Sequence, residues 1–356
     1  MNVRQSTQRV LSRLVHRQYF WAILAIIALI LVNLIKDPTY LSTSLDPETG
    51  HLVGNLIDIL RASAPIIMIA AGMSLVIATA GIDLSVGSVM AVSGAVCMQF
   101  LSVIGNSSSV GVGLAAVGLA LALSTVIGVF NGILVSSVKL QPFITTLITM
   151  MAGRGIAKVI TGGQNTAAQS TPVHWISNGY VVGLPVVFLL AIVLVVVLSL
   201  VIRRSALGMM IEAIGINPKA SRMAGIKPRG LLIAVYTLSA LMAGVAGIFS
   251  TATVMTVDVS QTGYMMELDA ILAVVIGGAT LAGGRFSIGG SVVGAILIAT
   301  LNKTVLFLGV SSSATPAFKA AVIVILVLLQ SDRIRALFAR RRRRKAPEAT
   351  KKEALV

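Results

Sequence analysis

Asp83 is the acidic side chain of this sequence whose presence most needs a chemical explanation. It is the only acidic residue between Asp58 and Glu212, in a stretch apolar enough to lie in a membrane. A charged side chain at mid-membrane costs about 2.5–3.5 kcal/mol on insertion scales, so a role or polar surroundings are expected. Three uses remain open: capping, with Ser85, of a helix that begins near Leu84 at the cytoplasmic boundary; a part in a solute pathway or its gating; and a proton relay. The relay is disfavoured because no second carboxylate lies nearby in the sequence.

Three further polar residues lie within apolar stretches. Asn131 is suited to a hydrogen bond between helices or to contact with a transported solute, and the first use is the more common one. Arg154 and Lys158 are four residues apart and therefore share one face of a helix. We expect these two cations to extend toward the interface or to pair with a carboxylate rather than to touch a solute.

No pattern of residues predicts an enzyme. His16, His51 and His174 are scattered along the chain, and Cys97 is the single cysteine, in an apolar run typical of a packing residue. No nucleophile–base or metal-ligand spacing is present, and the sequence has no Gly-x-x-x-x-Gly-Lys-Ser/Thr loop for nucleotide phosphates. We therefore predict no catalytic residue, no metal and no cofactor.

The composition indicates a membrane protein. Apolar residues make up 56% of the chain and charged residues 11%, and the mean hydropathy is +0.95. A soluble domain carries roughly twice that share of charge. The net charge of +16 does not indicate nucleic-acid binding, because ten of the 28 basic residues lie from Arg333 onward and four lie in the first 17 positions.

Apolar segments long enough to cross or partly cross a membrane predict an all-α polytopic protein of about ten helices. The break Gly105–Ser109 separates two spans within the long uncharged stretch after Asp83, and the segment Asp269–Arg285 is expected to be short or broken. The ten candidates are Tyr19–Ile35, 61–83, two spans within 83–139, Ile144–Ile160, Leu184–Ile202, Leu231–Thr253, Asp269–Arg285, Ile288–Phe307 and Pro316–Gln330.

Charge asymmetry predicts the orientation. If both termini are cytoplasmic, the inside regions contain 22 of the 28 basic residues, as the positive-inside rule requires. This topology divides the chain into a basic cytoplasmic N-tail (1–18), a transmembrane domain (19–332) with a large cytoplasmic loop (203–230), and a basic cytoplasmic C-tail (333–356). The cationic run Arg333–Lys352 in the C-tail is expected to be disordered or to lie against anionic lipid headgroups.

The cytoplasmic loop 203–230 contains a short helix with recognisable ends. Asn217 is predicted to be its N-cap, Pro218 its first residue, and Gly225 the residue just past its end. A helix of about two turns is not stable alone in water, which indicates that a partner holds it. The alternative is an amphipathic loop resting on anionic lipid.

Several motifs resemble one family of permeases. Residues 212–226 (Glu-Ala-Ile-Gly-Ile-Asn-Pro-Lys-Ala-Ser-Arg-Met-Ala-Gly-Ile) resemble the ATPase-docking loop of the ribose and branched-chain-amino-acid class of ABC importer permeases. Residues 80–88 are similar to the Gly-Gly-Ile-Asp-Leu-Ser-Val-Gly signature of its sugar branch, with Ala80 in place of the first Gly. Further matches are Asn131-Gly132, 141–147, Gly277-Gly278 and 283–286. Within the family, galactofuranose permeases look most similar.

The resemblance implies a non-catalytic subunit of a sugar importer in a bacterial inner membrane. Its partners would be a cytoplasmic ATPase, a second permease (identical or paralogous) and an extracytoplasmic sugar-binding protein, with the sugar passing between the two permeases. The runner-up is a permease of the same family for another small polar solute, and an ion-coupled secondary transporter is a more distant alternative. The residues assigned to ATPase coupling are Glu212, Ala213, Gly215, Asn217, Pro218, Ala220, Arg222 and Gly225. Those assigned to the substrate pathway or its gating are Asp83, Ser85 and Asn131.

Overall fold

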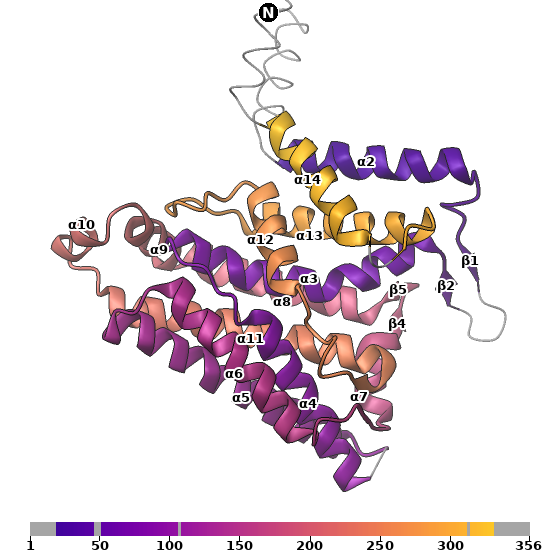
Figure 1. Ribbon diagram of the computed structural model, residues 1–356, viewed down its shortest axis with the longest axis horizontal. Helices are drawn as coiled ribbons and strands as arrows, with labels where there is room; N and C mark the ends of the chain where they lie inside the picture. The colour runs from indigo at the N-terminus through magenta and orange to yellow at the C-terminus, as the bar shows by residue number, and fades with distance from the viewer. Residues whose placement is uncertain (1–18, 46–50, 106–107, 312–313, 331–356) are drawn as a thin grey trace, which may run out of the picture.

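The computed structural model describes residues 19–45, 51–105, 108–311 and 314–330, and most of these residues are helical (Figure 1). The helices are α2 (Tyr19–Lys36), α3 (Asn55–Ala78), α4 (Val86–Ile104), α5 (Val110–Ile133) with a π-helical extension η1 (Leu134–Val138), α6 (Pro142–Ile160), α7 (Thr171–Asn178), α8 (Val186–Arg204), α9 (Leu207–Ile216), α10 (Pro218–Met223), α11 (Pro228–Val254), α12 (Met266–Ile276), α13 (Ile288–Phe307) and α14 (Thr315–Gln330). The prediction of an all-α membrane protein is confirmed.

Three antiparallel pairs of two-residue strands accompany the helices. They are β1 (Ser44–Leu45) with β2 (Leu52–Val53), β3 (Thr166–Ala167) with β6 (Thr256–Val257), and β4 (Tyr180–Val181) with β5 (Leu184–Pro185). In Figure 1, α9 and α10 lie at one end of the long axis, and β1, β2, β4, β5 and α7 lie at the other. We call these the α10 end and the strand end.

Helix α3 is the centre of the bundle. It packs against α8, α11, α12 and α13. Of its 18 most apolar consecutive residues, 78% are buried. Small residues allow the backbones to approach, as is common between membrane helices. A Cβ atom at Gly72, for example, would lie 2.9 Å from the Cα atom of Ser239 in α11. Helix α11 also packs on α4 and α5, so it joins the two halves of the core.

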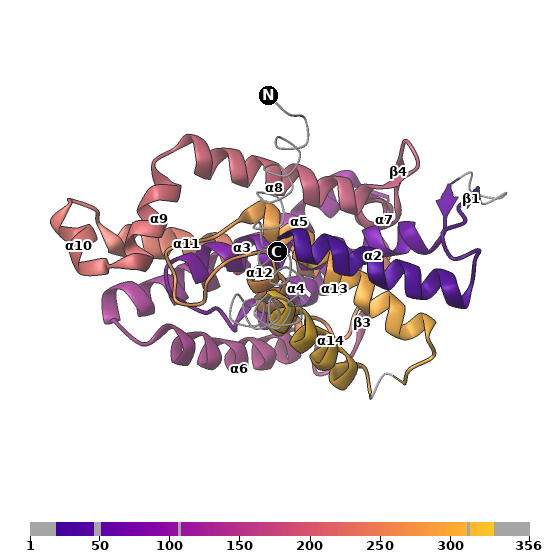
Figure 2. The same cartoon turned by 90° about the horizontal axis from the view of Figure 1, so that it is seen from above.

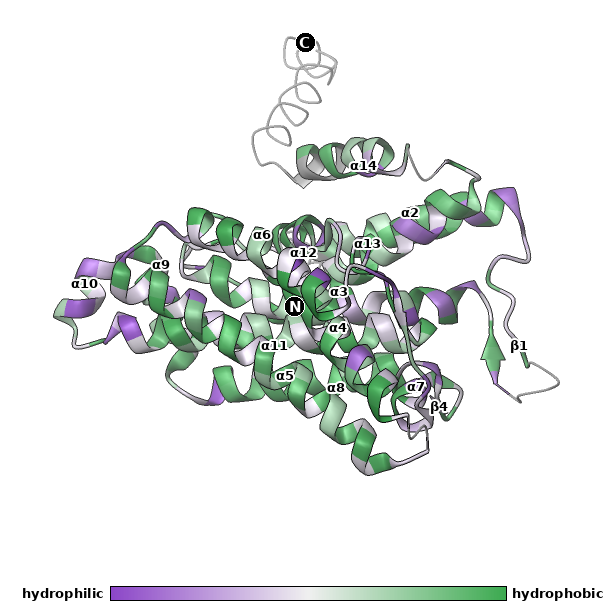
Figure 3. Cartoon of the chain, turned by 60° about the horizontal axis from the view of Figure 1, so that its bottom comes forward, coloured by the Kyte–Doolittle hydropathy of each residue, from purple (hydrophilic) through white to green (hydrophobic). Residues whose placement is uncertain are grey.

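The flanking helices are less buried than α3. Of the 18 most apolar consecutive residues, only 22% are buried in Val110–Val138, 28% in α6 and 33% in α8. Most of their apolar surface therefore faces outward. Figure 2 places α8 along one side of the molecule and α6 along the other, and Figure 3 shows α5 and α8 as mainly hydrophobic. Lipid or a partner must cover these faces.

Each of the ten predicted segments contains a helix in the described part of the chain. The break at Gly105–Ser109 is confirmed, because α4 ends at Ile104 and α5 begins at Val110. The segment from Asp269 is short as predicted, since α12 ends at Ile276. Among the described residues, seven helices are long and apolar enough to cross a membrane by length and composition, so the count of about ten spans stays a prediction. Helix α9 and helix α7 were not predicted, and both terminal tails lie outside the described residues.

Candidate functional site

Helix α10 has the ends that the sequence predicted. The side-chain Oδ1 of Asn217 accepts hydrogen bonds from the backbone N–H groups of Lys219 and Ala220, each at 3.0 Å. Pro218 is the first helical residue, where its missing N–H costs nothing. Gly225 has a φ of +85° just beyond the helix, a conformation that favours glycine. The local sequence alone therefore defines this helix.

Most of α10 and its flanks are exposed at one end of the molecule (Figure 1). Of the predicted coupling residues, the exposed ones are Asn217, Pro218, Ala220, Arg222 and Gly225. Two large apolar side chains are also exposed, Ile216 at 74% and Met223 at 91%. Ser221 is buried, and its hydroxyl donates to the carbonyl oxygen of Asn217 at 2.9 Å. Exposed apolar residues beside a short capped helix indicate a surface that lipid or a partner covers.

Gly215 is placed differently from the other predicted coupling residues. It is buried, and a Cβ atom there would overlap the carbonyl oxygen of Ala78, at the end of α3. It would also lie 2.5 Å from the backbone nitrogen of Gly284. Gly215 therefore makes a close backbone approach to other parts of this chain, and its assignment to ATPase coupling stays a prediction. Gly284 N–H in turn donates to the Ala78 carbonyl oxygen at 2.9 Å, so α9, α3 and residues 283–287 meet at one point.

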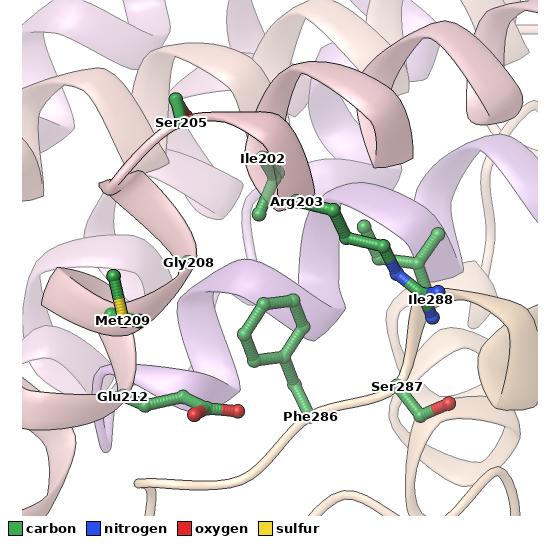
Figure 4. Close-up of a pocket in the computed structure, with 9 residues that line it drawn as sticks. All are labelled: Ile202, Arg203, Ser205, Gly208, Met209, Glu212, Phe286, Ser287 and Ile288. Carbon is green, nitrogen blue, oxygen red and sulfur yellow. The ribbon is translucent and has the colours of Figure 1, made fainter.

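Glu212 lines a cleft of about 350 Å³ between α9 and the segment that precedes α13 (Figure 4). Its carboxylate points toward the ring of Phe286, while Arg203 reaches across from the end of α8. The cleft is lined by Ile202, Arg203, Ser205, Gly208, Met209, Glu212, Phe286, Ser287 and Ile288. Ala213 beside it is partly buried. The cleft therefore lies between α9, the end of α8 and the start of α13.

The predicted pathway residues belong to a buried polar network between α3 and α4. Asp83 is fully buried, and its Oδ1 accepts from the backbone N–H of Ser85 at 3.0 Å and from the Ser85 hydroxyl at 2.5 Å. Its Oδ2 accepts from the hydroxyl of Ser239 in α11 at 2.9 Å. The carboxylate thus has three donors, which is how a buried charge is made tolerable.

Asn131 extends this network to two more helices. Its Nδ2 donates to the Ser85 hydroxyl oxygen at 2.9 Å, and its Oδ1 accepts from the hydroxyl of Thr149 at 2.6 Å. The donors run from Thr149 in α6 through Asn131 in α5 to Ser85 and end on Asp83. The hydrogen bond between helices expected of Asn131 is therefore confirmed.

The position of Asp83 differs from the capping hypothesis. Helix α4 begins at Val86, and among the described residues Asp83 accepts no hydrogen bond from the N–H groups of its first turn. Asp83 is enclosed by α11 and the residues around Ser85 rather than lying at an exposed boundary. Asp83, Ser85 and Asn131 form one cluster, and a part in gating stays a prediction for all three.

Long-range ion pairs were missed at the sequence level. Lys319 Nζ lies 3.0 Å from Asp269 Oδ2, joining α14 to α12, and Lys303 Nζ lies 2.6 Å from Asp58 Oδ2, joining α13 to α3. A charge in an apolar segment is a usable signal that a partner exists, but the partner is distant in sequence. Arg154 is partly buried and donates to the carbonyl oxygen of Thr262 at 2.6 Å, whereas Lys158 is exposed.

Comparison with known proteins gives the family. Residues 55–329 match the family model described as the permease component of the branched-chain amino acid transport system. The chain belongs to this permease family. It is 49% identical over 345 residues to the fructose import permease protein FruF of Bifidobacterium longum (strain NCC 2705), covering 96% of this chain and 95% of the relative.

Two further relatives of this permease come from Escherichia coli (strain K12). The galactofuranose transporter permease protein YtfT is 41% identical over 315 residues, covering 88% of this chain and 90% of the relative. The ribose import permease protein RbsC is 38% identical over 287 residues, covering 79% and 87%. No solved structure matches the permease. The family predicted from the motifs at 80–88 and 212–226 is therefore confirmed.

Proposed function

We propose that this permease is the non-catalytic, membrane-spanning subunit of an ATP-driven importer for a monosaccharide. A separate cytoplasmic ATPase supplies the energy, a second permease completes the pathway, and an extracytoplasmic binding protein delivers the sugar. The support is the family membership together with relatives named for fructose, galactofuranose and ribose. Another small polar solute is the second candidate, because the family description names branched-chain amino acids.

The proposed orientation puts the α10 end in the cytoplasm of a bacterial cell and both termini on the same side. Residues 203–230 carry Arg203, Arg204, Lys219, Arg222, Lys227 and Arg229. Such an excess of cations in a short loop is typical of the cytoplasmic face. The strand end then faces the binding protein on the other side of the inner membrane.

The observation that carries the proposal is the exposed, self-capped α10 with Met223 and Ile216 beside it. ATPase closure on this helix would pull α9, whose Gly215 sits against Ala78. Ala78 is the last residue of α3, and the connection that follows it (79–85) contains Asp83. The proposed mechanism therefore moves the α3–α4 connection, and the hydrogen bonds at Asp83, Ser85 and Asn131 hold that connection in register while it moves.

Reconstitution tests this proposal. The permease, its ATPase and its binding protein are placed in proteoliposomes, and uptake of fructose, ribose and galactofuranose is measured with and without internal ATP. Uptake that needs both ATP and the binding protein is expected. Uptake driven by an ion or proton gradient without ATP would instead support a secondary transporter.

A further inference from the structure

A second polar cluster lies where residues 258–265 cross α4 and α6. Arg154 Nη1 donates to the carbonyl oxygen of Thr262 at 2.6 Å, which fixes this loop to α6. Arg154 also interacts electrostatically with Glu267, in the first turn of α12, and with Tyr264. Tyr264 is 59% exposed. A guanidinium, a carboxylate and an aromatic ring thus gather on one face of the molecule.

Backbone contact holds the cluster in place. Gly263 has a φ of +70°, and a Cβ atom there would overlap the carbonyl oxygen of Gly87 in α4. A Cβ atom at Gly87 would in turn overlap Glu267 Oε2. Next to Arg154, a Cβ atom at Gly153 would lie 2.6 Å from the hydroxyl oxygen of Ser88. The three side chains are therefore presented by a rigid junction of α4, α6 and α12.

One atom of this junction lacks a hydrogen bond. Glu267 Oε2 is buried and has no hydrogen-bond partner among the described residues, although this oxygen could accept two hydrogen bonds. Buried carboxylate oxygens are almost always satisfied, because leaving one without a donor costs free energy. A donor from outside the chain would remove this cost in a transport state that opens the junction and exposes the oxygen.

The position of Arg154 along α6 argues against an ordinary surface role. Arg154 lies roughly 18 Å along α6 from Pro142 and roughly 9 Å from Ile160, at 1.5 Å per residue, so it lies within the helix rather than at either end. Charged side chains at such a depth face a bundle interior or a water-filled path rather than lipid tails. A purely structural role explains why Arg154 holds Thr262, but it explains neither the exposed ring of Tyr264 nor the unsatisfied oxygen of Glu267.

We propose that Tyr264, Glu267 and Arg154 form a transient contact site for the sugar as it crosses the membrane, an inference that rests on the proposed import function. Glu267 Oε2 accepts a hydrogen bond from a sugar hydroxyl, and Arg154 donates to a hydroxyl or ring oxygen. Tyr264 offers its ring to the apolar face of the sugar. Three contacts suit a path in which binding is strong enough to guide a solute and weak enough to release it.

The primary test uses Tyr264→Ala, because an exposed side chain can be removed without opening a cavity. Proteoliposomes contain the ATPase and receive a binding protein loaded with fructose or ribose, and sugar imported per ATP hydrolysed is measured for each sugar. About a tenfold loss is expected, with unequal losses for the two sugars and normal ATPase stimulation. Ser260→Ala, an exposed position on the same loop, is the matched control and should behave as wild type.

A second test is independent of transport. Cys97 is buried, so Tyr264→Cys adds a cysteine with little background from the native thiol. Free fructose or ribose at high concentration should slow its modification by a small water-soluble thiol reagent, and sugar should leave the modification of Ser260→Cys unchanged.

The outcomes separate this inference from the proposed function. Wild-type permease that imports no sugar with its partners contradicts the importer itself. Normal import and normal sugar preference by Tyr264→Ala, with no sugar protection of Tyr264→Cys, overturns the contact site and leaves the importer intact. Loss of ATPase stimulation by Tyr264→Ala also overturns it, because that result assigns Tyr264 to the structure of the junction. Glu267→Gln should lower import per ATP as Tyr264→Ala does, and wild-type import by this variant counts against the site.

Discussion

Helix α10 and the α3–α4 connection are both polar breaks in an apolar chain, yet they satisfy their polar groups in opposite ways. In the α3–α4 connection, Asp83 is fully buried and receives three hydrogen bonds from within the chain. Helix α10 caps itself through Asn217 but leaves Met223 91% exposed. The carboxylate of Asp83 is satisfied within the isolated subunit, whereas exposing the apolar side chain of Met223 to water costs free energy.

The two regions meet at Ala78. Its carbonyl oxygen accepts from Gly284 N–H, and Gly215 packs directly against it. The exposed region is therefore linked to the buried one through backbone contacts that leave no room for a side chain. A partner that moves α10 can act on the α3–α4 connection without any long flexible link between them.

The largest effect is expected for Gly215→Leu. A leucine side chain would overlap the backbone of Ala78 and Gly284, neither of which can rotate away. Overpacking costs about 1–3 kcal/mol when side chains can adjust, and more is expected here. Membrane yield and the midpoint of thermal unfolding in detergent should both fall. Gly230→Leu is the matched control, because Gly230 has open space around it. Equal stability of the two variants would place Gly215 on the partner surface instead.

Asp83→Ala should have the next largest effect. It leaves the hydroxyls of Ser85 and Ser239 without their acceptor in a buried site, at a cost of about 1–3 kcal/mol for each unsatisfied group. Asp83→Asn keeps one acceptor oxygen and should lose less. Thermal unfolding measures both variants, and the ordering Ala below Asn below wild type is the expected result. An Asp83→Ala variant as stable as wild type would mean that the network contributes nothing to folding.

Asn217→Ala should act locally. Loss of an N-cap costs about 1 kcal/mol, and a six-residue helix cannot absorb this loss. Hydrogen exchange at residues 218–223 should accelerate, and ATPase stimulation should fall several-fold, while the unfolding temperature stays within error of wild type. Asn217→Ser restores a capping oxygen and should recover most of the stimulation. If Ser recovers nothing, the amide of Asn217 serves in some way other than capping.

Lys303→Met should have the smallest effect. Its partner Asp58 is 53% exposed, and ion pairs of this kind contribute about 0–1 kcal/mol. The midpoint of thermal unfolding should move by no more than a few degrees, and import should continue. A large loss of stability here would mean that the strand end depends on this ion pair far more than its exposure indicates.

Apolar segment length, polar breaks and capping residues predicted much of the fold. The end residues of α10 were correct because Asn217, Pro218 and Gly225 act on neighbouring backbone groups. The burial of Gly215 could not be predicted, since it depends on Ala78 and Gly284, which are distant in sequence. For the same reason Asp83, Ser85 and Asn131 could be selected individually, but their shared network with Ser239 and Thr149 could not. Residues whose partners lie on other helices require the tertiary structure.

The accessibility of two introduced cysteines tests the central claim most directly. Met223→Cys lies at the α10 end and Val182→Cys at the strand end, and the native residues are 91% and 95% exposed. A membrane-impermeant thiol reagent is added to cells whose outer membrane is permeabilised and whose inner membrane is intact. It should modify Val182→Cys and leave Met223→Cys unmodified. After the inner membrane is opened, Met223→Cys should react, and the co-expressed ATPase should protect it. Modification of Met223→Cys from outside, or equal reactivity with and without the ATPase, would contradict the proposed orientation and docking surface.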